Sequence, residues 1–121
     1  MLDAGHQLRE DLNKEALGPG APDTEFRMDA GSVGVATGQQ EYDLTLEVCK
    51  RLKSVLEKRG YQVVLIRNHN AVSISYVERA QVANKLYADA YITLHAGFSE
   101  DETVQGVNTI CQTSKNAYNA G

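Results

Sequence analysis

Apolar and charged positions alternate with helical spacing over residues 41–59. The apolar members of this segment are Leu44, Val48, Leu52, Val55 and Leu56. Because they recur every three or four positions, they share one face of a helix, while lysine, arginine and glutamate side chains occupy the other face. Gly60 is suited to end the helix, since glycine tolerates the left-handed backbone that follows many helices. The pattern therefore predicts an amphipathic helix over residues 41–59.

Strand-like and helical segments alternate along the rest of the chain. Residues 61–67 (YQVVLIR) are rich in β-branched side chains and apolar on both faces, which is typical of a buried parallel strand. Ser75 and Glu78 match a capping box, so a second helix is predicted over residues 76–87. Residues 90–95 and 107–111 are predicted strands, and a further helix is predicted from residue 114. This order predicts an α/β fold of three layers, with a mostly parallel central sheet.

Residues 7–40 are rich in glycine and contain both prolines of the chain. The members are Gly18, Gly20, Gly31, Gly34, Gly38, Pro19 and Pro22. Such residues interrupt regular structure, so the segment is predicted to be a long loop with little of it. A loop of this length in a compact domain is usually functional or mobile. Ligands of parallel α/β sheets bind at the carboxyl ends of strands, where this loop is expected to lie.

Composition excludes several classes of protein. The 121 residues suit one domain, and 12 Lys and Arg against 16 Asp and Glu give a net charge of −4. An acidic balance argues against a nucleic-acid partner. The longest apolar run, residues 63–66, is too short to span a membrane. No signal peptide is recognisable after Met1.

The two cysteines, Cys49 and Cys111, are too few for a disulfide scaffold and lack the spacing of a thiol-based metal site. We predict two small buried thiols. A disulfide between them in a secreted setting stays open at this point.

Three residues that bind metals well fall at the expected ligand-binding edge of the sheet. His6 follows a short strand, His95 ends another strand, and Glu41 begins a helix. Two imidazoles and one carboxylate form a common ligand set of catalytic zinc, which leaves one position for water. Taken singly, each residue has a commoner role: a histidine that makes structural hydrogen bonds, or a glutamate that favours a helix N-terminus. The triad is therefore a hypothesis that wide spacing alone does not establish.

Several short segments, in this order, resemble the zinc-dependent N-acetylmuramoyl-L-alanine amidases of the amidase-3 family. They are Leu-Asp-Ala-Gly-His at 2–6, the helix start at Glu41, Val-Leu-Ile-Arg at 64–67, Glu-Arg-Ala at 78–80 with Ala-Asn at 83–84, Ala-Asp-Ala at 88–90, and Ile-Thr-Leu-His-Ala at 92–96. The resemblance implies that His6, Glu41 and His95 bind Zn²⁺. It also implies a six-stranded α/β fold and cleavage of the amide between N-acetylmuramic acid and L-alanine in peptidoglycan. The substrate implies an extracellular or cell-envelope location, with the chain a monomer or part of a larger multidomain protein.

The sequence also departs from the family pattern. Members of the family continue past the equivalent of Gly121 into a further helix and a strand that carries a glutamate acting as the catalytic acid/base, whereas no glutamate follows Glu102 here. The catalytic acid/base is thus expected to lie beyond Gly121. We therefore expect a single amidase-like domain over residues 1–121, incomplete relative to the six-stranded fold, that gathers metal ligands but turns over poorly. Glu100 or Glu102 could replace the missing acid/base, although a solvated acidic loop is the more ordinary role for this run.

Two rival functions fit parts of the sequence. The first is a non-catalytic module on the same fold that binds zinc or the cell wall. The second is a phosphate-binding domain that uses the amides of residues 31–38, but no Gly-Lys-Ser or Gly-Lys-Thr follows and no strand directly precedes these glycines.

Four further polar residues have open roles. Asp3 could orient a ligand imidazole or make local turn hydrogen bonds. Arg67 and Arg79 are predicted surface charges, unless they organise the loops around Asn70 and Asn84. His69 is predicted to be exposed in a polar loop.

Overall fold

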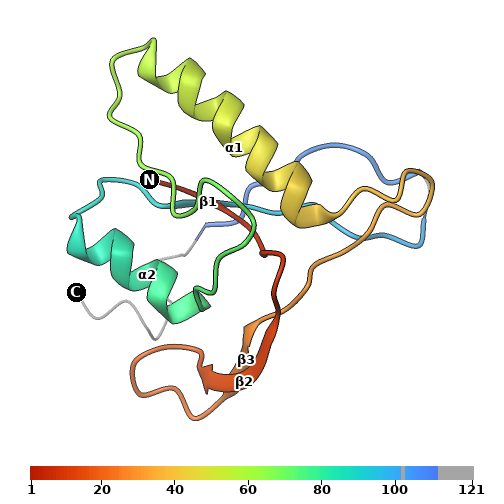
Figure 1. Cartoon of the computed structure of the whole chain (residues 1–121), viewed down its shortest axis with the longest axis horizontal. Coiled ribbons are helices and arrows are strands. Elements are labelled where there is room, and N and C mark those ends of the chain that lie inside the picture. The colour runs from red at the N-terminus through yellow and green to blue at the C-terminus, as the bar shows by residue number, and fades with distance from the viewer. Residues whose placement is uncertain (102, 112–121) are drawn as a thin grey trace.

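The computed structural model describes residues 1–101 and 103–111. Its elements, in chain order, are β1 (Leu2–Ala4), β2 (Asp11–Ala16), β3 (Thr24–Met28), α1 (Glu41–Glu57), α2 (Tyr76–Lys85) and β4 (Ile92–Leu94) (Figure 1). The helices predicted over residues 41–59 and 76–87 are confirmed, each ending two residues before its predicted end. Neither helix in the described part of the chain is long and apolar enough to cross a membrane.

The central sheet is built around β1. It pairs in parallel with β4, with Leu2 opposite Ile92 and Ala4 opposite Leu94. On its other side Leu2 forms an isolated parallel bridge with Leu65. The strand predicted over residues 61–67 is thus reduced to this single bridge.

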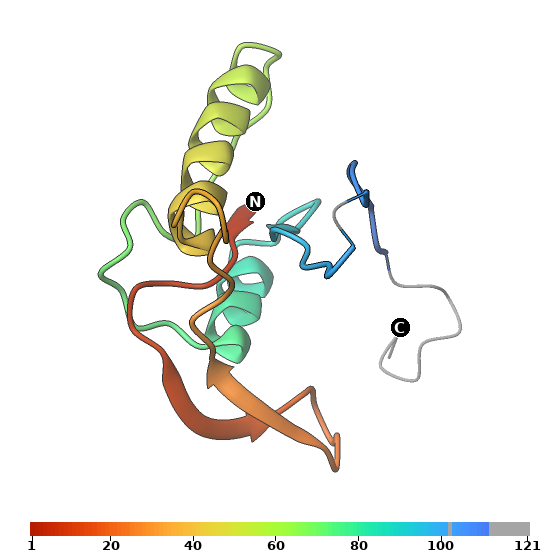
Figure 2. The same ribbon diagram turned by 90° about the vertical axis from the view of Figure 1, so that its right-hand side faces the viewer.

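The two helices pack against opposite faces of this sheet. Leu2 and Ala4 belong to a buried apolar cluster with Leu46 and Cys49 of α1. Successive strand residues point to opposite faces, so Asp3 faces the other way, where it pairs with Arg79 of α2. Figures 1 and 2 show β1 lying between α1 and α2. The predicted α/β fold, with a parallel sheet between helical layers, is confirmed.

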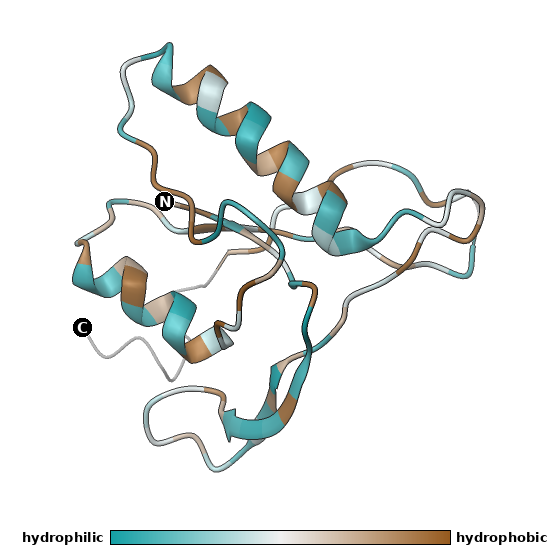
Figure 3. Cartoon of the chain, viewed as in Figure 1, coloured by the Kyte–Doolittle hydropathy of each residue, from teal (hydrophilic) through white to brown (hydrophobic). Residues whose placement is uncertain are grey.

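The first third of the chain contains regular structure that its composition does not predict. β2 and β3 pair as an antiparallel hairpin, with Lys14 opposite Phe26 and Ala16 opposite Thr24. The glycines and prolines of residues 18–22 are confined to its turn, where Gly20 takes a φ of 75° that favours glycine. Figure 3 shows that the hairpin is largely hydrophilic, which fits its place beside the main layers. The expectation of little regular structure in residues 7–40 was wrong for the hairpin, residues 11–28, while residues 29–40 follow an irregular path.

Predictions near the C-terminus have different outcomes. Residues 107–111 form no strand, and Val107 and Ile110 are each 95% exposed. No strand in the described part of the chain pairs with them. A β-branched composition is not sufficient to form a strand, because a strand also needs a partner for its backbone hydrogen bonds. The helix predicted from residue 114 lies outside the described residues. Gly121 also lies outside the described residues. The expectation that the catalytic acid/base lies beyond Gly121 stays a prediction.

The two cysteines differ in environment, which corrects the prediction that both are buried. Cys49 is fully buried on the inward face of α1, whereas Cys111 is exposed. Burial, with a smaller contribution from the charge of Asp3, raises the pKa of the Cys49 thiol to about 11. Since the thiolate is the reactive form, Cys49 should be inert at neutral pH.

We expect iodoacetamide at pH 8 to modify one thiol of the native chain rapidly and a second only in denaturant. Mass spectrometry of peptides should place the rapid modification on Cys111. A Cys111→Ser variant should show no rapid phase, and two rapid phases in the native chain would contradict the burial of Cys49.

Candidate metal centre

His6 leaves the end of β1 in a conformation that is unusual for a residue with a side chain. Its φ is 59°, in the left-handed region, and the residue is 7% exposed. Three side-chain hydrogen bonds hold the turn. Arg79 Nη2 donates to the His6 carbonyl at 3.1 Å, and Thr45 Oγ1 and Arg67 Nη2 donate to the Gly5 carbonyl at 2.9 and 3.0 Å. The surrounding structure thereby fixes where the imidazole points.

Glu41 is the first residue of α1, and its carboxylate is buried. Ser32 donates to Oε2 through its amide at 2.8 Å and its hydroxyl at 2.7 Å, and the Ala96 amide donates to Oε1 at 2.9 Å. Burial alone raises the pKa of the Glu41 carboxyl, but these hydrogen bonds and the nearby His6 outweigh it and lower the pKa to about 2. The carboxylate is therefore ionised at neutral pH, as a metal ligand must be.

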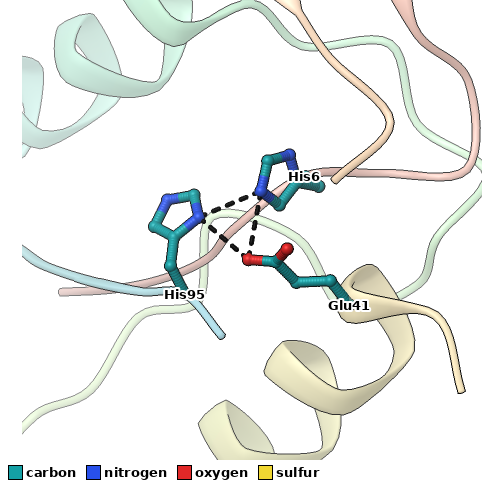
Figure 4. A group of neighbouring side chains, drawn as sticks. All are labelled: His6, Glu41 and His95. Carbon is teal, nitrogen blue, oxygen red and sulfur yellow. Dashed lines mark hydrogen bonds and ion pairs between the residues drawn. The ribbon is translucent and has the colours of Figure 1, made fainter. Parts of the chain in front are cut away.

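His95 follows β4 directly and completes a triangle with the other two side chains (Figure 4). Its Nδ1 lies 3.0 Å from His6 Nε2 and 3.2 Å from Glu41 Oε1, and His6 Nε2 lies 3.1 Å from Glu41 Oε1. The side chain of His95 is 42% exposed, whereas His6 and Glu41 are enclosed. The structure thus brings together the three residues that the sequence analysis named, with one side of the triangle accessible.

This triangle has the dimensions and chemistry of a metal site. A tetrahedral ion with bonds of about 2.0–2.1 Å needs donor atoms about 3.3–3.4 Å apart. The three separations are 3.0, 3.1 and 3.2 Å. The group could therefore hold a metal ion with only small side-chain adjustments.

Asp29 is a polar neighbour of the triangle that the sequence analysis missed. Its Oδ1 lies 2.5 Å from His6 Nδ1, on the side of the ring away from Glu41 and His95. Tyr76 donates its hydroxyl hydrogen to Asp29 Oδ2 at 3.0 Å. The Gly31 amide is a local partner of Asp29, but His6 and Tyr76 lie 23 and 47 positions away in sequence, so local sequence does not place Asp29 beside the triangle.

Asp3 has neither of the roles predicted for it. Its carboxylate accepts from Arg79 Nη1 and from the Tyr91 hydroxyl, each at 2.6 Å, and makes no contact with a triad imidazole in the described structure. It forms a buried ion pair beneath the site, with Arg79 1% and Asp3 2% exposed.

The prediction that Arg67 and Arg79 are surface charges was wrong. Arg67 is 3% exposed and donates to the carbonyls of Ala4, Gly5 and Tyr42. The Ala4 and Gly5 carbonyls lie where the short strand β1 ends, and the Tyr42 carbonyl lies in the first turn of α1, so one guanidinium joins these two elements through their backbone acceptors. Arg67 also donates to the Asn70 side chain at 2.6 Å, which is the loop-organising role that was the alternative. His69 is exposed, as predicted.

The remaining candidate residues do not join the triangle. Glu100 is exposed, and no hydrogen bond or ion pair links it to His6, Glu41 or His95 in the described part of the chain. Glu102 lies outside the described residues. In the glycine-rich loop, the Gly34 amide donates to the Gln39 carbonyl and the Gly38 amide to the Gly34 carbonyl. Because these amides already have acceptors, the loop gives no support to a phosphate cradle.

Comparison with known proteins identifies the family. Residues 1–121 match the sequence profile of the N-acetylmuramoyl-L-alanine amidases. The chain belongs to this amidase family. Its relatives include a putative N-acetylmuramoyl-L-alanine amidase of Buchnera aphidicola, 33% identical over 92 residues, which cover 75% of this chain and 41% of that protein. The amidase AmiC of Escherichia coli is 28% identical over 89 residues, covering 74% of this chain and 21% of AmiC.

A solved amidase has the same fold. The structure of the amidase Ami1 from Mycobacterium smegmatis superimposes with a TM-score of 0.70 at 28% identity, covering 78% of this chain and 44% of that chain. The chain thus spans less than half the length of these relatives.

Proposed function

We propose that this chain contributes the metal centre of a zinc-dependent amidase that hydrolyses the amide between N-acetylmuramic acid and L-alanine in peptidoglycan. His6, Glu41 and His95 hold the ion, through Nε2, Oε1 and Nδ1 respectively. The observation that carries the proposal is the triangle of these donor atoms, with sides of 3.0, 3.1 and 3.2 Å. The wall substrate places the protein in the cell envelope or outside the cell.

Counting protons supports a cation within this triangle. With the Nδ1 proton of a neutral His6 directed at Asp29, His6 Nε2 is an acceptor, and so is Glu41 Oε1, which lies 3.1 Å away. A single proton on His95 Nδ1 can satisfy only one of its two neighbours in the triangle. When both imidazoles are neutral, as metal ligands must be, at least one pair of acceptors therefore faces each other without a hydrogen between them, and a shared metal ion stabilises such an arrangement.

The chain's own residues prepare the site for amide hydrolysis. Ser32 and Ala96 hold the Glu41 carboxylate from both oxygens, so its donor atom needs little rearrangement on binding. The exposed His95 leaves one side of the triangle open to an incoming amide. Zinc bound there supplies Lewis-acid chemistry, since it lowers the pKa of water towards about 7 and polarises a carbonyl.

The proposal is tested by zinc affinity and peptidoglycan amidase activity in matched variants. His6→Ala, Glu41→Gln and His95→Ala should each weaken zinc binding by about 100-fold, because loss of a ligand costs at least as much as loss of its outer partner. Glu47→Gln, on an exposed turn of the same helix, should bind zinc like the unchanged chain. Competition with a chelator measures the zinc affinity of each variant. The amidase activity is measured on sacculi, from the new muramic acid carboxyl groups and alanine amino groups that cleavage of the amide produces.

The outcomes separate the competing functions. Zinc and sacculus binding without product would favour the non-catalytic module, whereas turnover that follows zinc occupancy would favour the amidase. Triad variants that bind zinc as tightly as the unchanged chain would contradict the metal site. The predicted slow turnover, which follows from an acid/base expected beyond Gly121, stays a prediction that the same assay checks.

A further inference from the structure

We propose that Asp29 is a positioning residue for the metal centre: it fixes the tautomer and orientation of His6, and Tyr76 holds Asp29 in place. This inference rests on the proposed zinc site. It concerns residues that make no contact with the ion themselves.

The geometry around His6 favours the tautomer that carries its proton on Nδ1. Asp29 Oδ1 lies 2.5 Å from His6 Nδ1, so a proton on Nδ1 is shared with a carboxylate. With the proton there, the lone pair is on Nε2, which lies 3.0 Å from His95 Nδ1 and 3.1 Å from Glu41 Oε1. A histidine that ligates a metal through one nitrogen commonly donates its other N–H to a carboxylate, which raises the basicity of the ligating atom.

The backbone that follows Asp29 restricts the position of the His6 ring on one side. Gly31 has a φ of 73°, and a Cβ built on it would lie 2.7 Å from the His6 ring. The Gly31 backbone therefore packs directly against the imidazole. The Gly31 amide also donates to Asp29 Oδ1 at 2.9 Å, so the segment that packs on the ring also orients the carboxylate.

Tyr76 anchors the other oxygen of Asp29 from a different element. Its hydroxyl donates to Oδ2 at 3.0 Å, and it is the first residue of α2, directly after the capping residue Ser75. Ser75 and Glu78 form a reciprocal capping box that holds this helix start. Asp29 is itself 46% exposed at its side chain, so without Tyr76 its carboxylate would have alternative solvated positions.

A relay of this kind predicts a pattern that general destabilisation does not produce. Asp29→Asn should weaken zinc binding by about 10–100-fold at pH 7.5. Tyr76→Phe keeps the ring but removes one hydrogen bond, so it should weaken binding by roughly 2–10-fold. Because Tyr76 acts through Asp29, the double variant should bind no more weakly than Asp29→Asn alone.

Two control variants match the chemical changes outside the relay. Asp23→Asn changes an exposed aspartate in the hairpin turn, and Tyr91→Phe removes a tyrosine-to-aspartate hydrogen bond that ends on Asp3. Both should bind zinc within about twofold of the unchanged chain. Urea unfolding of the zinc-free proteins records any general loss of stability separately.

The experiment measures affinity by competition with a chromophoric chelator, and the visible absorption spectrum of Co²⁺ placed in the same site. The expected result is weaker binding and an altered Co²⁺ spectrum for Asp29→Asn, with both unchanged in the controls. Should Asp29→Asn fail to fold, Tyr76→Phe supplies the same comparison. Affinity and spectrum unchanged in Asp29→Asn, while His6→Ala loses zinc, would overturn the positioning role alone. Failure of the unchanged chain to bind zinc would instead overturn the proposed function.

Discussion

Replacing Arg79 by methionine is expected to destabilise the zinc-free fold by about 3–5 kcal/mol, the cost of removing one partner of a buried ion pair. The Arg79 guanidinium is 1% exposed and donates to the Asp3 carboxylate and the carbonyls of Ala4, His6 and Ile74. Methionine fills much of the volume but removes the cationic partner of the buried Asp3 carboxylate, which keeps only the Tyr91 hydroxyl among the described donors, and removes one donor from each of these carbonyls. Urea unfolding followed by circular dichroism at pH 7 measures the loss.

Two comparison variants isolate the cause. Arg51→Met removes an exposed arginine paired with Glu47 one turn away, and should change the free energy of unfolding by less than about 0.5 kcal/mol. Asp3→Asn combined with Arg79→Met should recover part of the loss, because no unpaired charge then stays buried. An Arg79→Met protein within about 1 kcal/mol of the unchanged chain would show that the ion pair contributes little.

Gly31→Ala is expected to disrupt the fold and the metal centre together. The backbone φ of 73° is strained for alanine, and the added Cβ would lie 2.7 Å from the His6 ring and 3.2 Å from Glu41 Oε2. Left-handed backbone costs alanine about 1–2 kcal/mol, and overpacking adds about 1–3 kcal/mol. The ring and the carboxylate must both move, so zinc affinity should fall as well.

Gly38→Ala is the matched control for this change. Gly38 also has a left-handed backbone, with a φ of 68°, but nothing lies within 4 Å of a Cβ placed there. Its substitution should carry the backbone cost of about 1–2 kcal/mol without any loss of zinc affinity. Equal zinc affinities in the two variants would mean that the loop beside His6 yields freely and does not shape the site.

Much of the fold can be predicted from local sequence. The spacing of apolar residues along α1 and the capping box of α2 are local signals, because helices form hydrogen bonds within one segment. The strands are less certain, since a strand needs a partner from elsewhere in the chain. Residues 61–67 and 107–111 have strand-like composition, yet only Leu65 forms a bridge to β1. Conversely, the hydrophilic hairpin of β2 and β3 lies within a segment whose glycines and prolines suggest a loop.

The candidate ligands could also be named from sequence, because their residue types and their positions at the ends of predicted elements are visible there. The residues that hold these ligands in place could not be named from the sequence. Asp29 contacts His6 across 23 residues, and Arg79 contacts Asp3 across 76. An arginine usually lies at the surface, so the sequence predicted surface charges at Arg67 and Arg79, which the structure buries.

The amino-acid sequence alone therefore determined the α/β class, both helices, the family resemblance and the identity of the three residues His6, Glu41 and His95. Tertiary structure decided which buried charges neutralise one another, how Asp29 reaches the imidazole and Tyr76 reaches Asp29, and which cysteine is accessible. The physical reason is range: helix periodicity and caps act over a few residues, whereas burial and ion pairing depend on segments that meet only when the chain has folded.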